Sequence, residues 1–174
     1  ARCFYALEQN RADQKRYPAV NPIDSYSKYL EYPEIRQYLN ETIMPGWVEM
    51  VEKAKNIVRK GKEANDQINI LGDDGVPMSY HEIFWKSELL DFVILQQDAF
   101  DDIDALCPIE RQKYMLELVM GICERDYTFE DFEECRNYFK ELINALRQMN
   151  YSEFKSERFY EYQEKLNNLL SNGK

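Results

Sequence analysis

Apolar residues recur every three or four positions through most of the chain after residue 45, and this spacing restricts the possible folds more than any other feature. An α-helix has about 3.6 residues per turn, so the spacing gathers apolar side chains on one face that can be buried. The clearest stripes are Trp47, Met50, Val51, Ala54, Ile57 and Val58; Tyr114, Met115, Leu118, Val119, Ile122 and Cys123; and Phe132, Cys135, Phe139, Leu142, Ile143, Leu146 and Met149. No later segment alternates apolar and polar residues over a convincing length, as a half-buried strand does. The sequence therefore predicts an all-α fold in which helices pack on helices.

Glycine, proline and capping residues predict where these helices begin and end. Gly61 predicts a weak point or an end in the first long helix, because glycine is a poor helix former. The segment 72–77, from Gly72 to Pro77, is the clearest turn in the chain. Ser79 with Glu82 is typical of a capping box, so we expect the next helix to begin there. Thr128 is the predicted cap of a later helix.

The first thirty residues differ from the rest. Residues 2–7 resemble a short strand, but one strand cannot form a sheet, so we expect its partners to lie outside this chain. A short polar helix is expected over residues 8–15, ended by Tyr17-Pro18, because a residue before proline avoids the helical region. A further helix, capped by Asp24 or Ser25, is expected up to residue 30. The abrupt start predicts a piece cut from a longer protein.

Composition excludes several classes of function. The formal net charge is -10, and no basic cluster is larger than two or three residues, so we expect no nucleic acid to bind. An acidic surface instead favours protein partners or solubility. No apolar run approaches the ~20 residues that span a bilayer, which predicts a soluble, intracellular chain without direct membrane insertion.

The chain lacks the short motifs of nucleotide hydrolysis and of metal binding. Its six glycines form neither GxxxxGK(S/T) nor GxGxxG. The single histidine is His81, for which we expect a surface or helix-cap role. The cysteines form no CxxC pair, so we expect reduced thiols and no zinc site; they are Cys3, Cys107, Cys123 and Cys135. The sequence therefore predicts neither catalytic residues nor a metal site in this chain.

A run apolar enough to be buried, residues 89–95, breaks off into an acidic loop that ends at Pro108. Phe100 lies in this loop among Asp98, Asp101, Asp102 and Asp104, where the composition offers no reason for a large ring. Two interpretations remain open at this point: the ring either staples the flanking helices together or forms a platform for a ligand.

Two separated motifs resemble one known family. The first runs from Tyr17 to Ser27 (YPAVNPIDSYS), and the second comprises residues 95–101 (LQQDAFD) and 104–108 (DALCP). Together, in this order, they resemble the C-terminal part of the catalytic A (alpha) subunit of V/A-type rotary ATPases. The resemblance implies that residues 1–22 are the tail end of a nucleotide-binding α/β domain, with a strand, a short helix and the Tyr-Pro-Ala loop. Residues 23–174 would then be its C-terminal helical bundle.

The resemblance also implies functional residues. Tyr17 and Phe100 correspond to the two aromatic residues that sandwich the adenine ring in such subunits. Tyr17 stands where many relatives have phenylalanine, which keeps the stacking face. Gly72, Asp73, Asp74 and Gly75 correspond to a turn that acts as an acidic lever against the rotating stalk, although a merely exposed turn is the alternative. The full-length parent would bind ATP or ADP with magnesium, whereas this chain, without a phosphate loop, would not be catalytic and would hold no cofactor itself.

The family further implies partners and a location. The partners would be the B subunit and the central-stalk subunits of a proton- or sodium-translocating ATPase or ATP synthase. The domain would be cytoplasmic and peripheral on the membrane, in the soluble head of the enzyme. Two alternatives compete with this hypothesis: a stand-alone acidic helical module that binds other proteins, and the C-terminal domain of the non-catalytic B-type subunit.

Overall fold

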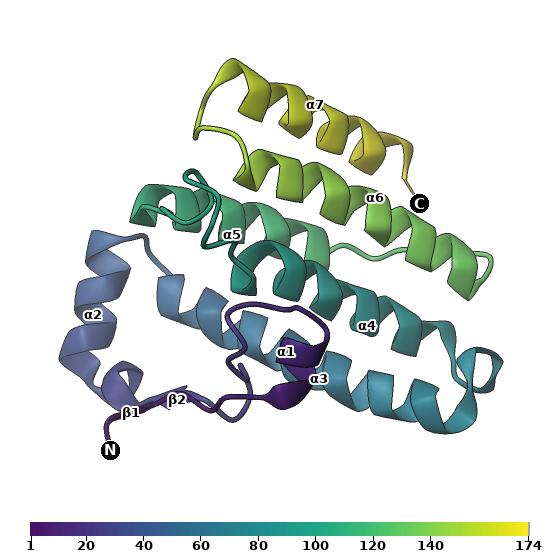
Figure 1. The fold of residues 1–174 in the computed structure, drawn as a ribbon, viewed down its shortest axis with the longest axis horizontal. Coiled ribbons are helices and arrows are strands. Elements are labelled where there is room, and N and C mark those ends of the chain that lie inside the picture. The colour runs from purple at the N-terminus through teal and green to yellow at the C-terminus, as the bar shows by residue number, and fades with distance from the viewer. Residues whose placement is uncertain (174) are drawn as a thin grey trace.

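A computed structural model describes residues 1–173 of the chain. In these residues the chain is mainly helical, as the periodicity predicts, and its one sheet has two short strands (Figure 1). The strands are β1 (Cys3–Phe4) and β2 (Tyr26–Ser27). The helices are α1 (Gln9–Asp13), α2 (Pro33–Thr42), α3 (Trp47–Leu71), α4 (Met78–Leu90), α5 (Ile109–Cys123), α6 (Phe132–Asn150) and α7 (Glu157–Asn172). The all-α prediction is confirmed.

The long helices form a stack in which α4 lies at the centre and α7 at the outer edge (Figure 1). The core fills the space between α4, α5, α6 and α7, and its fully buried side chains include Leu89, Val119, Phe139, Leu146 and Phe159. None of the helices in residues 1–173 combines the length and the apolar character needed to cross a bilayer.

The helix α3 runs through Gly61 without a break, so the predicted weak point there is wrong. Gly61 is buried against Ser87 of α4, where a Cβ atom would lie only 2.1 Å from the Ser87 Cβ. The absence of a side chain at Gly61 therefore allows α3 and α4 to pack closely at this point. The helix ends instead at Gly72, whose φ of 80° and ψ of 166° are readily adopted by glycine and rarely by other residues, and this turn was predicted.

Two predicted caps are wrong. Helix α4 begins at Met78 after Pro77, which leaves Ser79 inside the first turn, where it caps nothing. Helix α6 is capped by Asp131, whose Oδ1 accepts a hydrogen bond of 2.8 Å from the amide of Glu134, rather than by Thr128. Asp131 caps the helix in preference to Thr128 because it stands directly before the first turn, where its negative charge is favoured.

The N-terminal strand finds its partner inside the chain, in the segment where a helix was expected. β1 pairs antiparallel with β2, with Cys3 opposite Ser27 and Phe4 opposite Tyr26. The chain reverses between the strands at Asn21, whose side-chain oxygen accepts bonds from the amides of residues 23 and 24. These bonds, with one from the Ser25 amide to the Asn21 carbonyl, form a turn over residues 21–25 in place of the start of the predicted helix.

Candidate functional site

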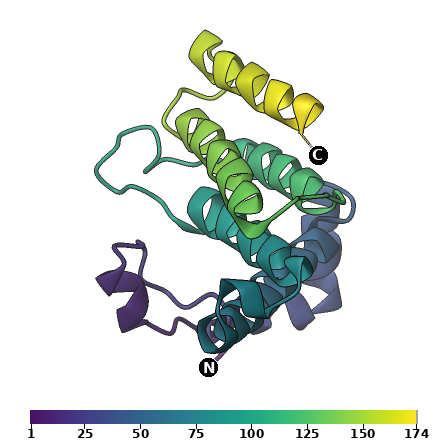
Figure 2. The ribbon, with the colours of Figure 1, turned by 90° about the vertical axis from the view of Figure 1, so that its right-hand side faces the viewer.

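Tyr17 and Phe100 line the same cleft, which has a volume of about 430 Å³. The N-terminal arm that carries α1 and the loop between residues 96 and 108 project from the same side of the helical block (Figure 2). The remaining walls come from both segments, from the stretch that follows α4 and from the end of α6, and they include Lys15, Phe92, Gln97, Asp98, Arg147 and Tyr151. Two rings that are distant in the sequence are thus brought together by the fold.

Phe100 stands at the tip of its loop and is 99% exposed, so the staple interpretation is wrong. The acidic residues around it fold the loop by accepting backbone hydrogen bonds. Asp98 Oδ1 accepts from the amide of Phe100 at 2.9 Å, and Asp104 Oδ2 accepts from the amide of Asp98 at 2.6 Å. Asp101 Oδ1 accepts in the same way from residues 103 and 104. These turns hold the loop backbone in shape while the Phe100 ring remains exposed.

Tyr17 lines the same cleft and is 55% exposed. Its carbonyl oxygen accepts a hydrogen bond of 3.0 Å from the amide of Gln97, three residues before Phe100. The two segments that carry the rings are therefore joined directly, next to the rings themselves.

Two arginines of the N-terminal arm form a largely buried ionic cluster with the end of α4. Arg11 donates to both oxygens of Asp91 at 2.8 and 2.9 Å. Arg16 donates to both oxygens of Glu88 at 2.8 and 2.9 Å and to Asp91 at 2.7 Å. The bond to Glu88 raises the pKa of the Arg16 guanidinium above its ordinary value, so the residue stays charged. These four residues, Arg11, Arg16, Glu88 and Asp91, are called the ionic cluster below.

Sequence reasoning missed the ionic cluster, although one signal for it exists. Asp91 interrupts the run Leu89-Leu90-Asp91-Phe92-Val93, which otherwise has the character of a buried segment. A carboxylate inside such a run must be paired, because burying an unpaired charge is costly. The pattern could have predicted a basic partner, but not which of the 22 lysines and arginines supplies it.

The helix α4 passes into the loop through a π-helical turn, Asp91–Leu95, which is closed by a 2.9 Å bond from the Gln96 amide to the Asp91 carbonyl. The carbonyl of Val93 accepts instead from Asn150 Nδ2 at 2.9 Å. Arg111 is also buried here and donates to the last carbonyls of α6, those of Met149 and Asn150. Turns of this kind occur frequently at functional sites, and here the turn aims the chain from the core toward the cleft.

The cleft contains charges of both signs. Burial raises the pKa of the Asp104 carboxyl above its usual value, while the Asp98 amide and the positive charge of Arg111 partly oppose that change. Arg147 lies 5.8 Å from the centre of the Phe92 ring. Residues 1–173 hold no group of three or more histidine, cysteine, aspartate or glutamate side chains arranged to bind a metal ion.

The predicted lever turn lies at the other end of α4 from the cleft. Gly72, Asp73, Asp74 and Gly75 are all exposed, and residues 73–75 form a single 3-10 turn. Of the two roles expected for His81, surface or helix cap, the surface role is wrong, because the residue is 4% exposed and its ring stacks on Phe132. Its Nε2 donates to the carbonyl of Asp73 at 2.8 Å, so His81 fastens the turn to the bundle.

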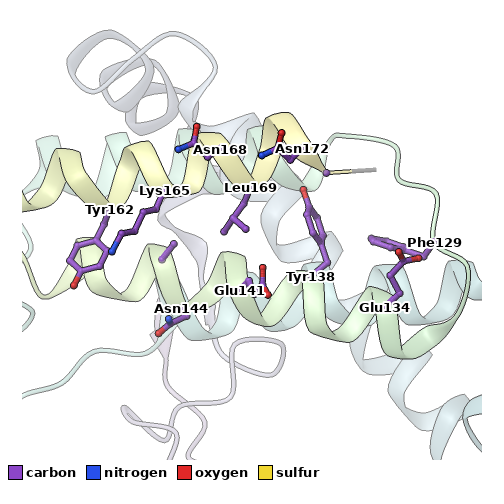
Figure 3. A pocket seen from close by; sticks show the side chains of 12 residues that line it. Phe129, Glu134, Tyr138, Glu141, Asn144, Tyr162, Lys165, Asn168, Leu169 and Asn172 are labelled. Carbon is purple, nitrogen blue, oxygen red and sulfur yellow. The ribbon is translucent and has the colours of Figure 1, made fainter.

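A second hollow, of about 630 Å³, lies between α6 and α7 (Figure 3). Asn144, Lys165 and Asn168 lie along it, and the Lys165 ammonium is 4.8 Å from the centre of the Tyr162 ring. Neither Tyr17 nor Phe100 lines this hollow, and the cleft that both residues line is therefore kept as the candidate site.

Comparisons with known proteins agree with the resemblance seen in the sequence. The family model described as the C-terminal domain of V and A type ATP synthase matches residues 36–126. A V-type ATP synthase alpha chain of Chlamydia pneumoniae is 38% identical over 167 residues, which are 96% of this chain and 28% of that protein. The alpha chain of Borrelia duttonii is 36% identical over 171 residues, 98% of this chain and 27% of that protein. The chain thus spans little more than a quarter of the length of the curated relatives it matches.

A solved structure supports the fold alone. It is a subunit described as a unique ATP synthase subunit NeqB from Nanoarcheaum equitans, with a TM-score of 0.53 and 17% identity, covering 72% of this chain and 29% of that one. The relatives that match nearly the whole sequence are named alpha chain, which supports the resemblance to an alpha subunit seen in the sequence. The chain belongs to the family of C-terminal domains of V- and A-type ATP synthases.

Proposed function

We propose that this chain acts within a catalytic alpha subunit, where Tyr17 and Phe100 hold the base of ATP or ADP between them. The observation that carries the proposal is that both rings line one cleft while each keeps an exposed face. An exposed aromatic face is what a planar base requires for stacking, and stacking is nearly indifferent to the rest of the nucleotide.

The strength of stacking limits what the chain can do alone. A base stacked on an aromatic side chain gains about 1–3 kcal/mol, whereas millimolar binding requires about -4 kcal/mol. Nucleotide is therefore held mainly through its phosphates, and we place the phosphate and magnesium sites in the remainder of the parent subunit. Residues 1–22 would belong to its nucleotide-binding domain and residues 23–174 to the helical bundle. Hydrolysis and synthesis require both parts, so this chain is not catalytic by itself.

The turn Gly72–Gly75 would make contact with the central stalk. Helix α4 joins it directly to the segment that leads to Phe100, and its 13 residues span about 20 Å. Because α4 is buried between α3 and α6, it can transmit a displacement as a rigid rod. Ile70 and Leu71 are exposed beside the turn and would add apolar contact area. The partners would be the B subunit and the stalk subunits of a proton- or sodium-translocating enzyme, on the cytoplasmic face of the membrane.

The base-binding role is tested by Phe100→Ala in the full-length subunit within the assembled ATPase. Loss of one stacking face should raise KM for ATP about 5- to 150-fold with little change in kcat. Folding should be unaffected, since the side chain is 99% exposed. Leu106→Ala is the matched control, because this residue is an exposed apolar side chain in the same loop and does not line the cleft. An unchanged KM in the Phe100 variant would contradict the proposal.

The lever role is tested by Asp73→Asn with Asp74→Asn in the same enzyme. We expect rotation or ion transport per ATP to fall while KM for ATP stays constant, because the turn is remote from the cleft. The control removes two exposed charges elsewhere, by Glu161→Gln with Glu164→Gln on α7. An equal loss of nucleotide affinity and of coupling would argue against a separate lever.

A further inference from the structure

We infer that the ionic cluster is a positioning device that sets the gap between Tyr17 and Phe100. The inference rests on the proposed base-binding function and extends it to residues that do not touch the base. It assigns to Arg16 in particular the task of holding the Tyr17 arm against the helical bundle.

The cluster is placed where it controls both rings. Arg16 immediately precedes Tyr17 and forks onto Glu88, while its other bond reaches Asp91. Asp91 begins the π-helical turn that leads into the Phe100 loop. These contacts, together with the bond from the Gln97 amide to the Tyr17 carbonyl, join the N-terminal arm to the segment that carries Phe100.

The geometry suits a rigid joint. The Arg11–Asp91 and Arg16–Glu88 pairs are both bidentate, so each guanidinium is fixed in direction as well as in position. Two positive and two negative charges leave the cluster neutral, which makes its burial tolerable. The Arg16 guanidinium also lies 4.8 Å from the centre of the Phe92 ring, and Phe92 is a wall of the cleft. A shift of the Arg16 side chain would therefore displace the Phe92 ring and change the shape of the cleft.

A preset gap lowers the entropy lost when a base enters, because the arm and the loop are already ordered. Without the ionic cluster, the N-terminal arm and the Phe100 loop would have to become ordered each time a nucleotide binds. Loss of the ionic cluster should therefore weaken nucleotide binding and raise KM, while kcat should change little.

The test is Arg16→Lys in the full-length subunit of the assembled ATPase. Lysine keeps the charge but cannot fork onto Glu88 and reach Asp91 together. We expect KM for ATP to rise about tenfold while kcat changes by less than about twofold. Arg36→Lys is the matched control, because Arg36 also pairs with two carboxylates, those of Glu49 and Glu52, but on the exposed surface of α2 and α3. Its KM should stay at the wild-type value.

A double-mutant cycle separates positioning from general destabilisation. In the Phe100→Ala background one wall of the base site is already missing, so Arg16→Lys should add little to the rise in KM. Multiplication of the two effects would mean that Arg16 acts independently of the ring pair and would overturn the inference. If Arg16→Lys fails to assemble, Glu88→Gln, which preserves size and removes one charge, should raise KM in the same direction.

The remaining outcomes distinguish the inference from the function on which it rests. A normal KM for Arg16→Lys together with a raised KM for Phe100→Ala would reject the positioning role and leave base binding intact. A normal KM for both variants would reject base binding, and the inference with it.

Discussion

Replacing Gly61 by alanine tests how closely α3 and α4 approach each other. The new methyl carbon would lie 2.1 Å from Ser87 Cβ, 2.4 Å from Ser87 Oγ and 3.3 Å from the carbonyl oxygen of Ile83. Non-bonded carbons rest at about 3.5–4.0 Å, so the helices must separate by roughly 1.5 Å at this point. The Ser87 hydroxyl can rotate away about χ1, but the Ser87 Cβ is fixed to the backbone of α4 and moves only if the helix moves.

The expected loss of stability follows from two opposing effects. Overpacking a close contact costs about 1–3 kcal/mol, and a clash this deep belongs at the upper end of that range. Alanine in place of glycine inside a helix gains about 1 kcal/mol. The free energy of unfolding should therefore fall by about 2 kcal/mol, which lowers Tm by about 4–8 °C for a chain of this size.

Thermal or urea unfolding of the 174-residue chain measures this loss, and a second glycine supplies the control. Gly121 lies inside α5, and a Cβ there would meet no atom within 4 Å. Gly121→Ala should consequently stabilise the protein by about 1 kcal/mol through helix propensity alone. Ser87→Gly removes the obstruction, so combining it with Gly61→Ala should recover part of the lost stability.

Opposite signs for the two glycine substitutions are the essential outcome. If Gly61→Ala stabilised the chain as much as Gly121→Ala, or if Ser87→Gly gave no rescue, the tight approach of α3 and α4 would be refuted. The idea that these helices move as one rigid body between cleft and turn would lose its support as well.

Two further predictions concern titrating groups. Burial raises the pKa of both Cys123 and Cys135 to about 12, so at pH 8 a thiol reagent should label these two cysteines only after unfolding. In the native chain the reagent should label Cys3 and, more slowly, the partly exposed Cys107, because burial raises the pKa of the Cys107 thiol as well. Burial raises the pKa of the Asp104 carboxyl in the native state above its value in the unfolded chain. Asp104 therefore stabilises the native state most while it is protonated, and this stabilisation is lost as the pH rises through the native pKa. Asp104→Asn should therefore be more stable than wild type in urea at pH 7, and the difference should vanish below about pH 4; a constant difference across pH would contradict this assignment.

The candidate site was only partly predictable. The Phe100 loop stood out because a large ring among aspartates has no local reason to exist, and Tyr17 came from the resemblance of its motif to a family. The ionic cluster and the role of Asn150 could not be predicted, since each joins residues at least 57 positions apart. The aspartates were noticed as charges, but their task in folding the loop depends on backbone geometry.

The sequence by itself determined the helical class, the buried faces of α3, α5 and α6 and the turn at Gly72, because these follow from local spacing and from the conformational freedom of one residue. Only the tertiary structure decided that β1 pairs with β2, that α3 continues through Gly61, that His81 is buried, and that the two rings share a cleft. Each of these depends on the position of a distant segment. The local sequence pattern indicates which face of a helix is buried. Which distant segment packs against that face depends on three-dimensional packing and on the pairing of buried charges.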